Sequence, residues 1–463
     1  MEDHTSDNSS KATVLFVAAL ASFLTPFMGS SINIALPSIG REFTMDAVLL
    51  GWVATSYLLS AAIFLVPFGR IADIYGRKRI FTYGIIIFTS TSLLLSITGS
   101  AAMLIVFRVM QGIGAAMIFG TGVAMITSAF PVGERGRALG INVATVYLGL
   151  SLGPLLGGLL TENFGWRSIF IVNVALGSVI IGLLYLKLKG DWAEAKGEKF
   201  DLVGSVIFGL AVAATIYGLS ILPNVSGIFV ILVGILGVLM FAKWEINTPS
   251  PILHMDLFLR NKIFAFSNLA ALINYSATFA VAFLLSLYLQ YIKGYGPQTA
   301  GFILVAMPVV QAILSPAAGR LSDKIEPRII ASIGMALTTV GLVFLVFIKQ
   351  DTGIIYIIFS LVILGLGFAL FSSPNTNAVM SSVGKRSYGI ASATIATMRQ
   401  IGMMLSMGIA MVLFAVYIGR VEITTEYYPA FMTSIKVAFG IFTVLCAGGI
   451  FASLARGKIR LME

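Results

Sequence analysis

The chain has 463 residues, of which 58% are hydrophobic and 11% are charged, and its mean hydropathy is +0.97. Soluble proteins carry about 25% charged residues, so this composition excludes a water-soluble multidomain enzyme and is typical of a protein whose solvent is mostly lipid. The net charge of +10 comes from short basic clusters between apolar segments, which suits loops at an anionic membrane surface and argues against a nucleic-acid partner.

Cysteine and histidine are too scarce to form a thiolate or metal site. Cys446 is the single cysteine of the sequence, and His4 and His254 are far apart. We therefore predict no disulfide within the chain, no metal site and no cofactor. Residues 1–11 are acidic and precede a long apolar stretch, a pattern unlike a secretory signal.

Fourteen apolar stretches are long enough to cross a bilayer, for which about 20 helical residues suffice. The pattern predicts an all-α polytopic membrane protein, since a membrane barrel would show alternating segments of about ten residues. The expected spans are 13–36, 48–68, 80–98, 101–129, 138–160, 167–187, 201–221, 226–243, 262–290, 299–318, 328–348, 353–373, 388–418 and 431–455.

The distribution of basic residues predicts the orientation. With the N-terminus placed in the cytoplasm, 22 of the 30 Lys and Arg residues fall in cytoplasmic tails and loops, as the positive-inside rule requires. We therefore expect a multi-pass protein of the plasma (inner) membrane with both termini cytoplasmic. The opposite side holds Arg41, Arg167, Lys293, Lys349 and Arg420, and the spans hold Arg108, Arg399 and Lys436, the last near a helix end from which it can snorkel.

An internal repeat predicts the domain organisation. The segment 69–79 (GRIADIYGRKR) returns as 319–328 (GRLSDKIEPR), each after the second helix of a six-helix set if spans seven and eight are an insertion. Within the insertion, 252–259 is expected to form a short interfacial helix. The predicted parts are a tail 1–12, an N-terminal half 13–187, an insertion 188–261, a C-terminal half 262–455 and a tail 456–463.

The 69–79 segment resembles the loop between the second and third helices of the major facilitator superfamily. The resemblance implies a major facilitator fold and a cytoplasmic latch made and broken between transport states. The carboxylate of Asp73 can be stabilised by a following helix N-terminus and by guanidinium groups. The alternative is a solvated loop whose charges set topology alone. The latch residues are Gly69, Asp73, Gly76, Arg77 and Lys78, with Arg135 and Arg137 as candidate partners.

Helix four is similar to the superfamily's fourth-helix motif, whose arginine is implicated in proton-linked transport. Arg108 lies seven residues into the span, with Gln111 one turn away on the same face. Because a guanidinium is costly in hydrocarbon, it should face protein or water. Its expected role is to tune a neighbouring carboxyl or hold a substrate dipole, and the alternative is packing against backbone carbonyls.

Helix five resembles the motif associated with antiporters in this superfamily. Glycines four residues apart allow another helix to approach closely, and a proline bends the helix. The resemblance favours export. The motif residues are Gly149, Gly153, Pro154, Gly157 and Gly158.

Two further segments resemble the fourteen-helix drug–proton antiporter branch, namely 33–37 at the end of helix one and 399–402 in helix thirteen. Arg399 and Gln400 are candidates for proton coupling or substrate binding, because the repeat places Arg399 at the position equivalent to the glycine stripe, where it would face the central cavity. Packing at a helix interface is the alternative for Arg399.

The sequence departs from that branch where helix one commonly carries an aspartate, because Met28 occupies the position. No Asp or Glu lies well inside a predicted span, and Glu245 is expected just past helix eight. Intramembrane charges are therefore positive, which favours neutral, zwitterionic or weakly anionic cargo. Asp73 is the leading group for proton coupling, with Glu42 and Glu162 as weaker options, or the substrate itself carries the exchanged charge.

Amide side chains within the spans need partners in protein or water and are candidates for lining a central cavity or joining helices. The cavity candidates are Asn33, Asn142, Asn274, Gln311, Asn375 and Asn377.

Together these features predict proton-coupled efflux of small lipophilic or amphiphilic compounds, such as drugs, by a monomer in the lipid bilayer. The alternatives are a dedicated exporter or importer of one metabolite or lipid, and a membrane sensor without transport. An intramembrane enzyme is disfavoured because the sequence shows no catalytic constellation. ATP-driven transport is disfavoured because the sequence shows no phosphate-binding loop.

Overall fold

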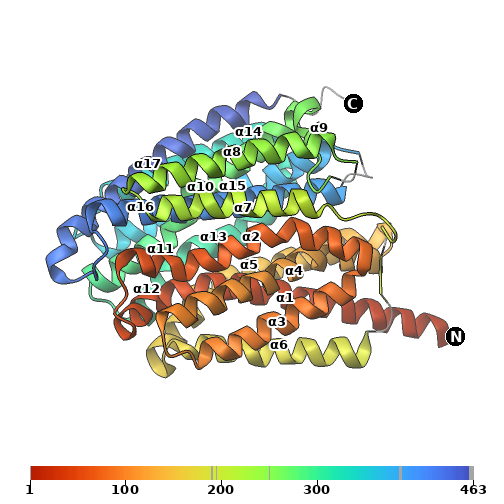
Figure 1. The fold of residues 1–463 in the computed structure, drawn as a ribbon, viewed down its shortest axis with the longest axis horizontal. Helices are drawn as coiled ribbons and strands as arrows, with labels where there is room; N and C mark the ends of the chain where they lie inside the picture. The colour runs from red at the N-terminus through yellow and green to blue at the C-terminus, as the bar shows by residue number, and fades with distance from the viewer. Residues whose placement is uncertain (1, 189–190, 194, 250, 385–387, 458–463) are drawn as a thin grey trace.

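The computed structural model describes residues 2–188, 191–193, 195–249, 251–384 and 388–457. Within these ranges every regular element is a helix, and fourteen helices are long and apolar enough to cross a membrane. The predicted all-α fold with fourteen spans is confirmed. Figure 1 shows both chain ends on the same side of the bundle, which we call the terminal side, and the opposite side is the far side.

The first six helices form the N-terminal half. In this half α1 packs on α5, α2 on α4, and α3 on α4 and α6. Helix α1 begins eleven residues before the predicted first span, because nothing in the polar residues before Thr13 interrupts the helix. The bounds are α1 (Glu2–Glu42), α2 (Ala47–Tyr75), α3 (Arg77–Ser96), α4 (Ala101–Ala129), α5 (Val132–Phe164) and α6 (Arg167–Lys187).

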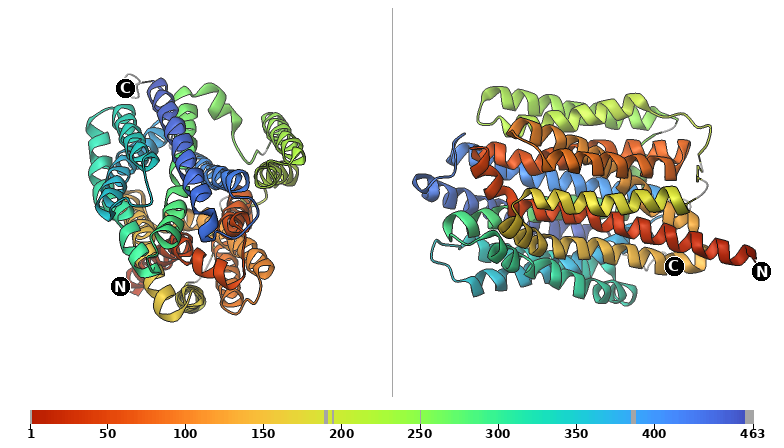
Figure 2. Two further views of the ribbon diagram at one scale, coloured as in Figure 1. Left: turned by 90° about the vertical axis from the view of Figure 1, so that its left-hand side faces the viewer. Right: turned by 90° about the horizontal axis from the view of Figure 1, so that it is seen from below.

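A hairpin of two helices, α7 (Leu202–Ser220) and α8 (Val225–Asn247), lies at the edge of the bundle (Figure 2, left). Helix α7 contacts both α2 and α16, so the hairpin touches both halves. The short helix expected after it is α9 (Met255–Arg260). The boundary predicted for α8 was wrong, because Glu245 lies inside that helix and is 2% exposed.

The C-terminal half repeats the arrangement, but its first two spans are interrupted. Helix α12 ends at Leu304 because Pro308 has no N–H to donate to the Leu304 carbonyl. At the α10–α11 break, the N–H of Ala280 donates to Ser406 Oγ of α16. The bounds are α10 (Lys262–Thr278), α11 (Ala280–Leu287), η1 (Tyr288–Ile292), α12 (Pro297–Leu304), α13 (Ala306–Lys324), α14 (Pro327–Val346), α15 (Ile354–Ser381), α16 (Tyr388–Tyr417), η3 (Thr425–Tyr427) and α17 (Tyr428–Ala455).

The expected C-terminal tail begins within the folded protein. Arg456 follows α17 and is 1% exposed, so it is not a free cytoplasmic charge. Its Nη1 donates to Asn375 Oδ1 at 2.9 Å and to Ser267 Oγ at 3.2 Å, and its Nη2 donates to Ser453 Oγ at 2.7 Å. These bonds join α10, α15 and α17 at the terminal side. Residues 458–463 lie outside the described ranges.

Candidate functional site

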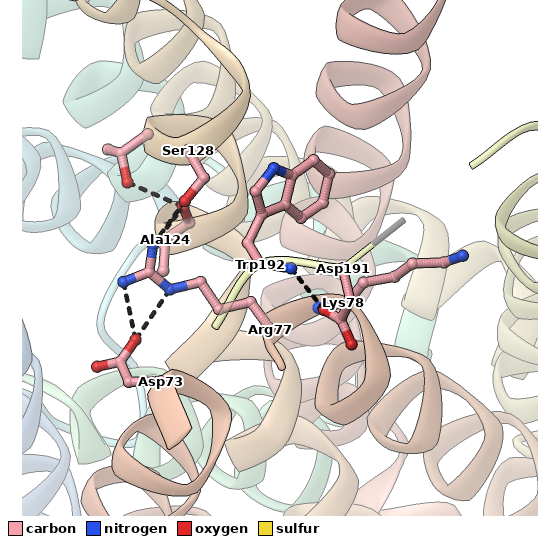
Figure 3. A network of polar contacts seen from close by, with 8 residues as sticks. Asp73, Arg77, Lys78, Ala124, Ser128, Asp191 and Trp192 are labelled. Carbon is pink, nitrogen blue, oxygen red and sulfur yellow. Dashed lines mark hydrogen bonds and ion pairs between the residues drawn. The ribbon is translucent and has the colours of Figure 1, made fainter. Parts of the chain in front are cut away.

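The N-half loop, residues 69–79, is built around one glycine and one ion pair (Figure 3). Gly76 has φ +119, a conformation that side chains beyond glycine rarely adopt, and it separates α2 from α3. Arg77 then begins α3, and its Nε and Nη2 lie 2.8 Å from Asp73 Oδ1. Arg77 also donates to Ser128 Oγ and to the carbonyl of Ala124 in α4. The loop is thus fixed to α4 by a charge-assisted network.

The partners expected for Asp73 from the next loop lie elsewhere. Arg135 Nε donates to the carbonyl of Phe130 at 2.7 Å, within its own loop, and Arg137 is exposed. Asp73 pairs instead with Arg77, one turn further along the chain. The pair therefore lies within one loop rather than between two.

The 188–200 connector leads from α6 to the hairpin, and its described residues, 188, 191–193 and 195–200, include several that contact the N-half loop. Asp191 Oδ1 accepts from the N–H of Lys78 at 2.9 Å, and the Trp192 carbonyl accepts from the N–H of Arg77 at 2.8 Å (Figure 3). Further along, the N–H of Ala195 donates to the Asp73 carbonyl at 2.9 Å. The Lys78 ammonium donates to the Leu188 carbonyl. Sequence reasoning missed this contact, for which the Asp191–Trp192 pair in a polar connector was the available signal.

Arg108 is buried against α2 and α3 rather than beside a carboxylate. Its Nε donates to the Val53 carbonyl at 3.0 Å, its Nη1 donates to Gln111 Oε1 at 2.6 Å, and its guanidinium lies 4.3 Å from the ring centre of Tyr57. Gln111 in turn donates to Ser92 at 2.8 Å. Arg108 is 1% exposed. These contacts match the packing alternative, and a substrate could reach the guanidinium only after the helices move.

The glycine stripe of α5 packs its backbone against two helices. A Cβ on Gly149 would lie 2.5 Å from the Phe23 carbonyl of α1, and a Cβ on Gly157 would lie 2.9 Å from Ser31 Cα. On the other face, a Cβ on Gly158 would lie 2.5 Å from the Pro297 carbonyl of α12, and the Pro154 carbonyl fills the space beside Gly301. Any larger residue would separate the helices, so the stripe serves contacts within and between the halves. Gly153 faces Ser30 of α1 in the same way.

Hydrogen bonds join the two halves on the far side. Ser286 Oγ donates to the Asn33 carbonyl at 2.7 Å, and Gln290 Nε2 donates to the Ile34 carbonyl at 2.9 Å. Glu162, at the end of α5, accepts from the N–H of Gln298 at the start of α12 at 2.8 Å. Glu42 binds Arg167 and Trp166 within the N-terminal half. The far side is therefore closed by interhelical bonds.

Arg399 lies beside aromatic side chains of the C-terminal half. Its guanidinium is 5.6 Å from the ring centre of Tyr275 and donates to Thr376, while its buried Nε has no hydrogen-bond partner. Phe368 packs edge-on against Tyr275 at 5.2 Å. The arrangement offers an unused donor beside aromatic faces.

The remaining candidates are distributed over several helices. Asn375 joins the buried Arg456 network, and Asn377 Nδ2 donates to Asp323 Oδ1 at 3.2 Å. Buried polar atoms without a described hydrogen-bond partner occur at Asn33, Asn142, Asn274 and Gln400, and Gln311 is buried in α13. Met28 Sδ accepts from Asn173 Nδ2 at 3.3 Å, and Lys436 is half-buried in α17.

Two six-helix halves, a small-residue seal between them and buried polar groups at their interface define a membrane transporter. The model of the Major Facilitator Superfamily matches residues 18–407 and 267–459. The chain belongs to this superfamily and is a transporter rather than an enzyme.

Among its relatives, the chain is 29% identical over 444 residues to the riboflavin transporter RibZ of Clostridioides difficile, covering 96% of this chain and 97% of that protein. It is 31% identical over 466 residues to the cephamycin export protein CmcT of Amycolatopsis lactamdurans, covering 98% and 95%. It is also 31% identical over 401 residues to the multidrug resistance protein Stp of Mycobacterium tuberculosis, covering 85% and 74%.

A solved bacterial homolog of the human lysosomal transporter Spinster, in an inward-facing and unoccupied conformation, has the same fold. Its TM-score is 0.72 at 16% identity, over 96% of this chain and 97% of that one.

Proposed function

We propose that this protein exports small lipophilic or amphiphilic compounds across the plasma membrane in exchange for protons. The observation that carries the proposal is the far-side closure, in which the α5 stripe meets α12 backbone to backbone. With both termini in the cytoplasm, as the basic loops predict, this closure keeps the central region away from the exterior while cargo loads from within. Opening would require α5 and α12 to separate, which Pro154 favours because its missing N–H weakens α5 at that point.

Cargo without strong positive charge fits the central region best. Arg399 brings an unbonded donor to the aromatic rings of Tyr275 and Phe368. A planar, neutral or weakly anionic compound could stack on these rings and accept a hydrogen bond from the guanidinium. A dication would be disfavoured, because none of the described residues named around Arg399 carries a carboxylate to balance its charge.

For proton coupling, Asp73 is the leading group. Protonation would remove the charge that pairs with Arg77, and would thereby loosen α3 from α2. Glu162 is a second candidate, since its carboxylate binds α12 across the far side. The roles of Asp73 and Glu162 both depend on the proposed exchange of cargo for protons.

The relatives named for cephamycin and multidrug export support the direction of transport. The riboflavin transporter favours a second function, the transport of one metabolite with a planar ring system. The position of Arg399 beside the Tyr275 ring is compatible with either cargo.

Inside-out membrane vesicles would test the proposal. Addition of respiratory substrate acidifies their interior, and fluorescent amphiphiles should then accumulate, with loss of accumulation in Asp73→Asn and on dissipation of the pH gradient. Accumulation of riboflavin alone among the compounds tested would support the single-metabolite transporter. Accumulation of the amphiphiles that does not depend on the pH gradient would exclude proton coupling.

A further inference from the structure

The terminal end of the α7–α8 hairpin holds two buried carboxyl groups. Asp201 caps α7, with Oδ1 accepting from the N–H of Gly204 at 2.9 Å. Trp244 of α8 donates its indole N–H to Asp201 Oδ2 at 3.0 Å. Asp201 is 9% exposed although no basic side chain is among these partners.

Glu245 follows Trp244, and its carboxyl group lies near that of Asp201, beside Gly204. Its Oε2 accepts from the N–H of Leu253 at 2.8 Å, which ties α8 to the segment before α9. Its Oε1 is buried without a hydrogen-bond donor. A Cβ on Gly204 would lie 2.7 Å from that oxygen and would also clash with Asp201 Oδ2, so the two carboxyl groups share the space that the glycine leaves.

The contact between the two carboxyl groups needs a proton. Two carboxylate oxygens are both acceptors, so Glu245 and Asp201 can be hydrogen-bonded to each other only if one of them is an acid. Two adjacent buried carboxylates would also repel, and burial itself disfavours a second charge. An unpartnered oxygen on a side chain that is 2% exposed is costly unless such a bond satisfies it.

The other charged groups near this end act elsewhere. Arg70 of α2 and Asp256 of α9 both act on His254, and Arg70 is paired with Glu198 of the 188–200 connector. Lys243 of α8 is exposed. Asp201 is therefore the charged neighbour that acts on Glu245, in addition to the burial of that carboxyl group.

We propose that Glu245 and Asp201 together bind one proton, with the Glu245 carboxylic acid donating from Oε1 to Asp201 Oδ2. The proton comes from water and returns to it, and no other group changes. The site belongs to the hairpin rather than to either six-helix half, so it goes beyond the proposed transport function. Its release of a proton would place two negative charges between α7, α8 and the segment at Leu253.

Infrared spectroscopy of the full-length protein in lipid nanodiscs would detect the acid directly. We expect a carboxylic acid C=O band that is present at neutral pH, disappears at alkaline pH and is lost in Glu245→Gln. The glutamine amide can donate to Asp201 and accept from Leu253, so this variant should fold. Asp256→Asn removes an exposed neighbouring carboxyl and should leave the band unchanged. A spectrum of Glu245→Gln identical to wild type would overturn the proposal.

Trp244 offers a second readout, independent of transport. In a protein with Trp52, Trp166 and Trp192 replaced by Phe, its emission should shift over the pH range in which the acid band disappears. Glu245→Gln should abolish that shift, whereas Asp256→Asn should retain it. An emission shift that persists in Glu245→Gln would assign the titration to another group and contradict the shared proton.

Discussion

The two copies of the repeated loop occupy the same position in each half but are held differently. In the N-half loop, Gly76 has a positive φ and separates α2 from α3, and Arg77 forms an ion pair with Asp73. In the C-half loop, residues 319–328, the equivalent positions are Glu326, with φ −51, and Pro327, which begins α14. There Asp323 accepts a hydrogen bond from the Asn377 side chain.

The comparison teaches that the repeat keeps its carboxylate, while the residue that begins the next helix changes from Arg77 to Pro327. Proline can start a helix as well as arginine can, but it brings no charge to the aspartate. The N-half loop also lies under the 188–200 connector, which adds backbone bonds to Arg77 and Lys78. We infer that the N-half loop is the one whose opening controls transport, and the following predictions test that asymmetry.

The largest expected effect separates the two aspartates. Asp73→Asn should lower the initial transport rate about tenfold or more, because it removes a charge-assisted bond worth about 1.5–3 kcal/mol. Asp323→Asn should change the rate by less than about threefold, since an amide can still bond Asn377. Initial rates at matched protein levels in proteoliposomes measure both. Equal losses in the two variants would end the claim of asymmetry.

Next in size is the backbone requirement at Gly76. Gly76→Ala should lower the free energy of unfolding by about 1–3 kcal/mol, because φ is positive and the new Cβ would meet the Asp191 carboxylate. Thermal unfolding in detergent would show the loss. Gly99→Ala is the matched control, since open space surrounds that glycine. A Gly76→Ala protein as stable as the control would mean that the loop adapts without strain.

A smaller effect is expected from the connector. Asp191→Ala removes the acceptor for the N–H of Lys78 and should cost about 1 kcal/mol, with a rate decrease of about twofold to fivefold. Proteolysis of the connector should become faster while the far-side seal is unaffected. Unchanged proteolysis and transport would show that the connector rests on the loop without holding it.

The smallest expected effect is at His254, beside Arg70 of the N-half loop. Burial, followed by the charge of Arg70, lowers the pKa of His254 below its ordinary value of 6.5. The unfolded state therefore binds the proton more readily, and this contribution to stability is present above pH 6.5 and lost as the pH falls. His254→Gln should reduce the acid-induced decrease in Tm by about 2–4 °C at most. A steeper acid-induced decrease in Tm in His254→Gln would contradict a lowered pKa of His254.

Hydropathy and charge were sufficient to predict the fourteen helices, because each span must satisfy its own backbone in lipid. The same reasoning located Arg108 beside Gln111, since residues three apart face each other on a helix. It could not foresee that Arg77 would displace Arg135 and Arg137 as partner of Asp73, because that choice depends on the path of the chain after Gly76. Arg456 was assigned to the cytoplasmic tail because a basic residue after the last span is typical of a tail. In the structure it is buried among three helices. Glu245 was placed just past helix eight because the hydropathy falls before that helix ends.

The exchange of cargo for protons is the central claim, and proteoliposomes with an enclosed pH-sensitive dye test it most directly. Addition of an amphiphile that the protein carries should move protons in the wild type and in Asp323→Asn, and the movement should be lost in Asp73→Asn. Measurable cargo flux with no proton movement in the wild type would contradict the account and indicate a uniporter or another coupling ion.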